Sequence, residues 1–295
     1  MPGTILVVGA TGNVGRSLVL ELDRGGAAVR AATRDPASAR ARASVPAGVD
    51  LVRFDLEEPG TFEPALRGVD RVFLMARPGD EHADRVALPL IDAMERSAVQ
   101  HVVDLSAIGV ELRPEFALRK VELRLEASAA AGRMSYTHLR PNWFMQVFSG
   151  GPLLEQLRAT RTIRIPAANA KLSWIDARDV AAVAAAVLTG TGHVGKAYTL
   201  TGDEALDHAE VAAILGSAIG ATIHYEPIDD DEARRVLGSA GLPPPWIERL
   251  VRFYALVRTG LGAAVSSAVR EVLARPARTF QDFARDYAAA WSRTN

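Results

Sequence analysis

The sequence contains no cysteine among its 295 residues. A chain without cysteine forms no disulfide and offers no thiolate nucleophile or thiolate metal ligand, so it does not look like a small secreted scaffold. An excess of one charge is also missing, because 34 basic and 35 acidic side chains give a formal net charge of -1. We therefore expect no binding to nucleic acid and a small molecule as the main partner.

Long apolar runs, zinc motifs and hydrolase motifs are absent as well. No apolar stretch is long enough to span a bilayer and no basic leader precedes the first strand, so we expect a soluble cytoplasmic protein without membrane contact. The six histidines include no pair at the spacing of helical zinc ligands, so no metal site is expected. No GxSxG segment occurs, which leaves hydrolase chemistry without support.

Apolar segments typical of strands recur along the chain, with amphipathic helical stretches between most of them. The expected strands are residues 5–8, 28–32, 49–54, 71–75, 101–105, 135–139 and 197–200. Strands that alternate with helices predict right-handed crossovers and a parallel sheet covered on both faces. The expected fold is α/β, a doubly wound parallel sheet in a single domain over residues 1–295.

Residues 142–172 and 204–295 do not follow this alternation. We expect them to form a small C-terminal substrate lobe over the carboxyl edge of the sheet, where doubly wound proteins bind ligands. One helix of this lobe begins after a run of prolines and carries an apolar face of Trp246, Leu250, Phe253, Tyr254 and Val257. Core packing is the first interpretation of this face and a substrate-lining role is the alternative. The oligomeric state is left open between monomer and homodimer.

Three glycines stand between the first expected strand and the first expected helix, in "VVGATGNVG". Gly9 permits a tight turn, Gly12 lets the backbone approach a pyrophosphate, and Gly15 lets the helix pack close to the strand. The free amides and the helix dipole then stabilise the phosphate charge. The pattern predicts a dinucleotide site in a Rossmann-like fold, with a purely structural turn as the alternative. The expected cofactor contacts of this turn are Gly9, Thr11, Gly12, Asn13, Val14 and Gly15.

The end of the second expected strand reads "AATRDP". An acidic residue at this place holds the ribose 2'-hydroxyl of NAD, whereas an arginine suits the 2'-phosphate of NADP. Arg34 offers a bidentate fork to a phosphate and Thr33 adds a hydroxyl. Asp35 is followed by Pro36 and is interpreted as a turn residue. NADP is therefore favoured over NAD, and a solvated surface arginine is the alternative for Arg34.

Residues at the ends of the later strands complete the expected site. Asp55 is positioned to accept a hydrogen bond from the adenine amino group, although a capping role is the alternative. Arg77 faces either the cofactor or water. The residues expected at this edge of the sheet are Asp55, Leu56, Ala76, Arg77 and Ser106.

These motifs together resemble the NmrA-like, atypical branch of the short-chain dehydrogenase/reductase superfamily. The resemblance covers nearly the whole chain and implies an NADP-binding domain with a small variable C-terminal lobe. Members include quinone and isoflavone reductases, ene and imine reductases of secondary metabolism, and non-catalytic redox sensors. The matching segments are "VVGATGNVG", "TRDP", "DLSAIG" at 104–109, "KVELRLEAS" at 120–128, "YTHLRPNWFMQ" at 136–146 and "WIDARDVAAV" at 174–183.

In the superfamily that this chain resembles, catalysis uses a set of Ser, Tyr and Lys, in which Tyr exchanges a proton and Lys holds the nicotinamide ribose. The resemblance implies Ser106 and Lys120 as catalytic residues here, with Lys120 also on the ribose. Phe116 stands where Tyr is expected, four residues before Lys120, so the usual proton donor is missing. A solvated helix-surface lysine is the alternative for Lys120.

The same resemblance places the segment after the sixth strand beside the nicotinamide, with backbone groups that orient its carboxamide. Trp143 and Phe144 then exclude water from the reacting ring, and core packing is the alternative for both. The residues expected to bind the cofactor in this segment are Pro141, Asn142, Trp143 and Phe144.

The function expected from these residues is an NADPH-dependent reductase of a small electrophilic metabolite. The acceptor carries a C=C, C=N or quinone group, which takes up hydride without the usual catalytic Tyr. One alternative is a non-catalytic NADP-binding redox sensor or regulator. The other is a cyclase or isomerase on the same fold.

Overall fold

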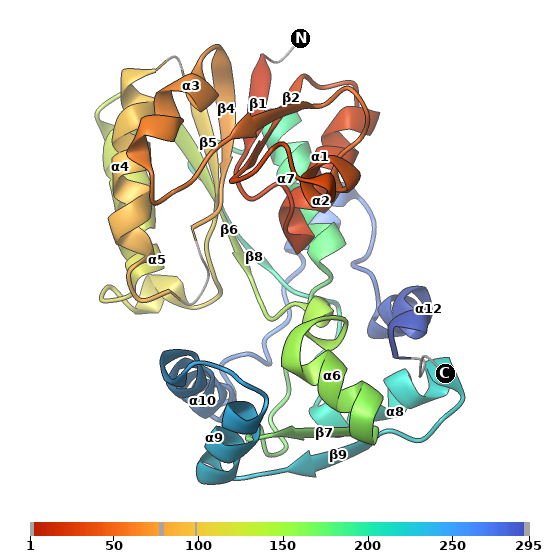
Figure 1. The fold of residues 1–295 in the computed structure, drawn as a ribbon. Helices are drawn as coiled ribbons and strands as arrows, with labels where there is room; N and C mark the ends of the chain where they lie inside the picture. The colour runs from red at the N-terminus through yellow and green to blue at the C-terminus, as the bar shows by residue number, and fades with distance from the viewer. Residues whose placement is uncertain (1–2, 77–79, 98, 292–295) are drawn as a thin grey trace. The chain divides into compact units, whose positions relative to one another are not determined.

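The computed structural model describes residues 3–76, 80–97 and 99–291 of the chain. It divides into two compact units, each of which is described by itself (Figure 1). The sheet unit comprises Met1–Pro141, Ala177–Leu200 and Ala268–Arg275. The second unit comprises Asn142–Asp176, Thr201–Ser267 and Pro276–Asn295.

The sheet unit is built on a seven-stranded sheet in the order β3-β2-β1-β4-β5-β6-β8, and every neighbouring pair is parallel. The chain winds outward from β1 to β3 and then returns to β4 on the other side of β1, which places the topological switch point between β1 and β4. The predicted Rossmann-like, doubly wound fold is confirmed. The strands are β1 (Thr4–Val7), β2 (Val29–Thr33), β3 (Asp50–Arg53), β4 (Val69–Leu74), β5 (His101–Leu105), β6 (Ser135–Pro141) and β8 (Ala197–Leu200).

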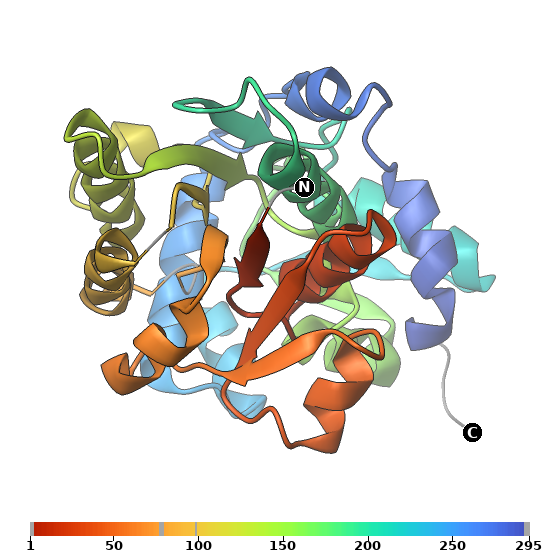
Figure 2. The same ribbon diagram turned by 90° about the horizontal axis from the view of Figure 1, so that it is seen from above.

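Helices cover both faces of this sheet, as Figure 2 shows from above. On one face α1 (Asn13–Arg24) packs against α7 (Ala177–Thr189), and on the other α4 (Ala83–Arg96) packs against α5 (Ala117–Ala130). The shorter elements of the unit are α2 (Ala39–Ser44), η1 (Pro59–Thr61), α3 (Phe62–Leu66), η2 (Val110–Leu112) and α11 (Ala268–Leu273).

The central strands are buried on both faces, which explains why their sequences are continuous apolar runs. Ile5, Leu6 and Val7 are all completely buried. Leu6 and Val72 belong to a hydrophobic cluster that α3, α4 and α5 complete. Strands buried on both faces are typical of parallel sheets. The continuous apolar runs in the sequence were therefore enough to predict these central strands.

The second unit combines a two-stranded parallel sheet with helices. The strands β7 (Thr162–Ile165) and β9 (His224–Pro227) pair with each other and were not predicted, because both are four residues long and β9 is largely exposed. Around them lie η3 (Met145–Phe148), α6 (Gly151–Thr160), α8 (His208–Ile219), α9 (Asp230–Ser239), α10 (Pro244–Arg258) and α12 (Phe280–Trp291).

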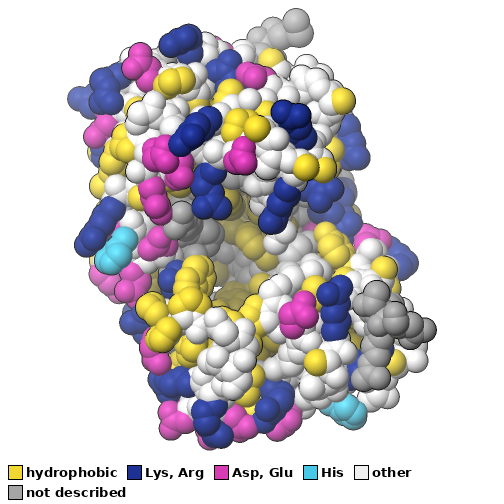
Figure 3. All heavy atoms as spheres, in the orientation of Figure 1, with side chains coloured by type: hydrophobic (Ala, Val, Ile, Leu, Met, Phe, Trp, Pro, Cys, Tyr) yellow, Lys and Arg dark blue, Asp and Glu magenta, His cyan; other side chains and the backbone are white. Residues whose placement is uncertain are grey.

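The surface carries basic and acidic side chains in mixture, as Figure 3 shows for one face. This mixture agrees with the formal net charge of -1. Within the described ranges, the helices all fall short of the length and apolar character that crossing a lipid bilayer requires.

Candidate functional site

The glycine turn follows β1 in the sheet unit and leads into α1. Gly9 adopts a φ of +72°, in the left-handed region that favours glycine, and its carbonyl accepts a hydrogen bond of 2.9 Å from the Gly12 amide. A Cβ on Gly15 would lie 2.2 Å from the Gly9 oxygen, whereas a Cβ on Gly12 would lie 3.3 Å from the same atom. The fold itself therefore requires Gly9 and Gly15, whereas a side chain at Gly12 would need the Gly9 oxygen to shift by only a few tenths of an ångström.

Gly12 is the N-cap residue of α1, and no side chain caps this helix. The first turn of α1 also contains no acidic residue. The first amides of a helix have no intrahelical acceptor, and the positive end of the helix dipole lies at the same place. The turn thus presents open N–H donors and a favourable potential to an anion.

Arg34 follows directly after β2 and is exposed. Its guanidinium has no hydrogen bond or ion pair with any residue that the structure describes. The Asp35 carboxylate instead accepts a bond of 3.0 Å from the Ala37 amide, which is the turn role that the sequence predicted for it. An uncommitted guanidinium at the carboxyl end of β2 is available to an anionic ligand.

Residues at the ends of the later strands form hydrogen bonds and packing contacts within the protein. An Asp55 carboxylate oxygen accepts a bond of 3.0 Å from the Glu57 amide two residues later, which is a turn contact within the protein and not a helix cap. Leu56 is partly buried against the core and Ala76 is fully buried. Arg77 lies outside the described residues. Of the residues at this edge that the structure describes, the glycine turn and Arg34 have polar groups without a partner in the protein.

Ser106 and Lys120 occupy different environments in the sheet unit. Ser106 is buried, and the hydrogen bond of its hydroxyl with Glu122 helps to lower the pKa of that carboxyl. The Lys120 ammonium forms an ion pair of 3.1 Å with the Asp84 carboxylate of α4. Phe116 is the N-cap residue of α5, so a nonpolar ring stands where the superfamily has its phenol. The catalytic roles of Ser106 and Lys120 remain predictions.

A buried network of charges joins α5 to β5 and β6. Asp104 and His138 lie opposite each other in the sheet, with 3.2 Å between Oδ2 and Nδ1. Glu122 accepts hydrogen bonds of 2.8 and 2.9 Å from Arg140 and another of 2.8 Å from Arg119. Burial raises the pKa of Asp104, and the hydrogen bond from His138 only partly offsets this. Burial is the largest influence on Glu122 and acts to raise its pKa, but the hydrogen bonds from Arg140 and Ser106 and the nearby His138 and Arg140 groups together outweigh it, so the pKa of Glu122 lies below the usual range.

This network was not predicted from the sequence. Ligand atoms of Asp104, Glu122 and His138 lie within 4.8 Å of one another, which approaches the spacing of metal ligands. Both oxygens of Glu122 nevertheless accept bonds from guanidinium groups, and these groups compensate its charge. The signal in the sequence was the presence of polar residues within β5, at His101 and Asp104, and within β6, at Thr137 and His138.

The segment after β6 is held by its own side chains within the second unit. Asn142 is buried, and its amide nitrogen donates bonds of 2.7 Å to Ser173 Oγ and 2.8 Å to the Gly262 carbonyl. Its Oδ1 accepts a bond of 2.9 Å from the Trp143 amide. Phe144 forms a bridge with Ile175. Asn142 therefore fixes the backbone of this segment, and its side chain is fully used in doing so.

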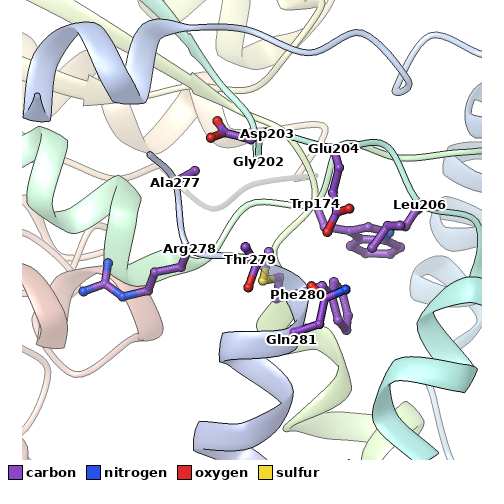
Figure 4. Close-up of a pocket in the computed structure, with 11 residues that line it drawn as sticks. Trp174, Gly202, Asp203, Glu204, Leu206, Ala277, Arg278, Thr279, Phe280 and Gln281 are labelled. Carbon is purple, nitrogen blue, oxygen red and sulfur yellow. Dashed lines mark hydrogen bonds between the residues drawn. The ribbon is translucent and has the colours of Figure 1, made fainter. Parts of the chain in front are cut away.

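A pocket of about 250 Å³ lies within the second unit (Figure 4). Its apolar part includes Trp174, Leu206 and Phe280, and its polar part includes Asp203 and Arg278. In Figure 4 Trp174 lies close to Phe280, while the Arg278 side chain extends away from both. None of the individual residues predicted from the sequence to bind the cofactor lines this pocket, although most of its lining residues belong to the segments 142–172 and 204–295 of the expected substrate lobe.

His208 lies fully buried next to the aromatic residues of this unit. Its ring centroid is 5.3 Å from that of Trp174 and 5.5 Å from that of Tyr225. Neither ring nitrogen has a hydrogen-bond partner among the described residues. Burial lowers the pKa of His208 to about 3, so the ring is neutral at physiological pH.

Replacing His208 with phenylalanine is expected to stabilise the protein by about 1–3 kcal/mol at neutral pH, because a buried nitrogen without a partner costs that much. The unfolded state protonates this histidine near pH 6.5 and the folded state only near pH 3. Stability therefore falls as the pH drops through this window, by about 2 kcal/mol between pH 6.5 and pH 5. His208→Phe removes this loss.

Urea unfolding of both proteins near pH 7 and near pH 5 measures the effect. The pKa of His101 is also lowered, to about 4, mainly by burial, but His101 is present in both proteins and cancels in the comparison. His224→Phe, at an exposed position, is the matched control and should retain the full pH dependence. Equal losses of stability at low pH in wild type and His208→Phe would contradict the prediction.

Comparison with known proteins identifies the family. The NmrA-like family matches residues 1–270. The chain is 35% identical over 287 residues to an NAD(P)H azoreductase of Xenophilus azovorans, covering 97% of this chain and 99% of that protein. It is 36% identical over 292 residues to a (4-alkanoyl-5-oxo-2,5-dihydrofuran-3-yl)methyl phosphate reductase of Streptomyces griseus, covering 98% and 99%.

Among solved structures, the NADPH-dependent quinone oxidoreductase of Escherichia coli complexed with NADPH superposes with a TM-score of 0.81. The sequence identity is 22%, and the match covers 96% of this chain and 99% of that one. The likeness to this structure shows the fold. Because the family match and both relatives extend over most of the sequence, the chain belongs to the NmrA-like family.

Proposed function

We propose that the protein is an NADPH-dependent reductase of a small electrophilic metabolite with a C=C, C=N or quinone group. The observation that carries the proposal is the glycine turn, whose open amides and missing side chains suit a pyrophosphate. The predicted oxidoreductase class and nicotinamide cofactor agree with the names of the relatives. Those names specify azo, dihydrofuran phosphate ester and quinone chemistry.

In this proposal the sheet unit binds the dinucleotide through main-chain amides and through the guanidinium group of one arginine. The amides around Gly12 bind the pyrophosphate, and Arg34 with Thr33 binds the ribose 2'-phosphate. The residues in place fit such a group, because no side-chain cap and no acidic residue of the first turn occupies the start of α1 and Arg34 has no described partner. Bound NADPH supplies a hydride.

The side chains at the superfamily catalytic positions restrict the acceptor. Phe116 has no proton to give, Ser106 is buried, and the Lys120 ammonium is paired with Asp84. The proposal therefore does not depend on a proton donated by these groups to a newly formed alkoxide. A conjugated acceptor spreads its negative charge after hydride uptake and then takes its proton from water. This requirement supports a C=C, C=N or quinone group in place of a simple ketone.

Steady-state oxidation of NADPH with a panel of quinones, enones and imines tests the proposal. The expected result is saturable, acceptor-dependent oxidation that is faster with NADPH than with NADH. Tight NADPH binding without oxidation by any acceptor would contradict the proposal and support the redox sensor. Product formed without net cofactor consumption would instead support the cyclase or isomerase.

A further inference from the structure

Helix α10 carries two apolar faces, which differs from the single face predicted from the sequence. Ile247, Val251, Tyr254 and Val257 are buried and form the first face. The second face includes Trp246, which is 48% exposed, and the partly buried Leu250 and Phe253. Spacings of four and seven residues from Trp246 place both of these side chains on its side of the helix. The core interpretation therefore holds for Tyr254 and Val257 and fails for Trp246.

A positive charge lies among the side chains of the second face. The Arg249 guanidinium stacks on the Trp246 ring, with 4.0 Å from Cζ to the ring centroid. Arg249 is partly buried and has no hydrogen bond or ion pair with the described residues. The neighbouring Glu248 is already held by Arg234, at 2.8 Å. A partly desolvated cation without a counterion favours an anion beside it.

The second face continues to the segment that follows β6. The Trp143 ring lies 6.4 Å from the Phe253 ring and nearly perpendicular to it, at 80°. Trp143 also lies 5.2 Å from the ring of Tyr254. Trp246 and Phe253 are seven residues apart, which is about 10 Å along a helix. We name Trp143, Trp246, Arg249, Leu250 and Phe253 the α10 strip.

We infer that the α10 strip binds the acceptor substrate, and that this acceptor is a planar aromatic molecule bearing an acidic group. The rings of Trp143, Phe253 and Trp246 contact its faces and edges, and Arg249 pairs with its sulfonate, carboxylate or phosphate. A length of about 10 Å suits two or three fused or linked rings. The inference rests on the proposed function and adds its substrate class.

A small molecule fits the α10 strip better than a protein does. Aromatic side chains bury about 150–250 Å² each when fully covered, and these are already partly buried, so the strip offers on the order of 300 Å². A stable protein interface needs about 800 Å² from each partner. A second copy of the chain on this face is therefore the weaker alternative, and the experiment includes it.

Two matched acceptors, a naphthoquinone and its sulfonate, test the inference in steady-state NADPH oxidation. Arg249→Gln is expected to lower the ratio of kcat/KM for the sulfonate to that for the neutral quinone by about 10-fold, through the loss of a charge-assisted hydrogen bond. Arg235→Gln, on the exposed surface of α9, should leave the ratio at the wild-type value. Trp246→Ala should raise KM for both acceptors. An unchanged ratio in Arg249→Gln would overturn the inference while the reductase function stands.

Equilibrium binding separates failure of the inference from failure of the proposed function. Naphthalene sulfonate, which takes up no hydride, should quench tryptophan fluorescence in the wild type and bind about 10-fold more weakly to Arg249→Gln. This result without reduction of any quinone, enone or imine would support the strip as a site and refute the reductase function. Sulfonate binding that is equal in both proteins, with sedimentation showing a dimer that Trp246→Ala dissociates, would overturn the inference in favour of an interface between copies.

Discussion

Replacing Gly12 with valine is expected to weaken NADPH binding by about 100-fold or more. The branched side chain would occupy the space that we assign to the pyrophosphate and would remove its hydrogen bonds to the first amides of α1, each worth about 1.5–3 kcal/mol. The fold should persist, because Gly12 has an ordinary φ of -83°. Its nearest neighbour, the Gly9 oxygen, would lie 3.3 Å from an added Cβ. Fluorescence titration with NADPH measures the change.

The choice of glycine decides whether this experiment is informative. A Cβ on Gly15 would lie 2.2 Å from the Gly9 oxygen, so a variant there is expected to disturb the fold and would not isolate binding. Gly60→Val is the matched control, since a Cβ at Gly60 meets no atom within 4 Å. A Gly12→Val protein with the wild-type melting temperature and unchanged NADPH affinity would refute the assignment of the turn.

Arg34→Glu is expected to weaken NADPH binding by about 100-fold and NADH binding by only a few-fold. The change replaces a cation that suits the 2'-phosphate with an anion that repels it, whereas NADH has a hydroxyl there. Arg34 has no described partner in the protein, so its loss should not affect folding. Dissociation constants for both coenzymes, measured by calorimetry, give the result.

Arg235→Glu in α9 makes the same charge change at another exposed arginine and controls for the effect of net charge. High salt should reduce the difference between NADPH and NADH in the wild type, because ion pairing with the phosphate is screened. Equal losses of affinity for NADPH and NADH in Arg34→Glu would show that the residue does not select the 2'-phosphate.

The sheet and its glycine turn were predictable because they depend on local signals. A strand buried on both faces must be apolar throughout, as Ile5, Leu6 and Val7 are. A left-handed backbone at Gly9 and a close approach at Gly15 exclude side chains, so both requirements appear directly as glycine. Asp229 likewise accepts a bond of 2.7 Å from the Glu232 amide and caps α9, a local contact between residues three positions apart.

Features that depend on distant segments were not predictable. The bond of 2.8 Å from Asn142 to Gly262 joins residues 120 positions apart, and no local pattern announces it. The two faces of α10 appear as one apolar surface in the sequence, because spacing cannot show which residues another element covers. The pairing of Lys120 with Asp84 depends in the same way on the packing of α5 against α4.

The residues of the site predicted from the sequence thus fall into groups that differ in the physical reason for the prediction. The roles proposed for Gly12, in the turn after β1, and for Arg34, at the end of β2, follow from the fold class. Roles for Ser106, Lys120 and Trp143 depend on how a bound ligand would contact them, and they stay predictions. The α10 strip could not be predicted from the sequence, in which Glu248 stands next to Arg249 as a possible counterion. The structure shows that Glu248 pairs with Arg234 instead, which leaves Arg249 without an ion pair among the described residues.

Calorimetric titration of the purified wild-type protein with NADPH, NADP⁺, NADH and NAD⁺ at two temperatures tests the central claim most directly. The account predicts saturable binding of one NADPH per chain, with affinity at least about 10-fold above that for NADH. Absence of binding with all four coenzymes would contradict it.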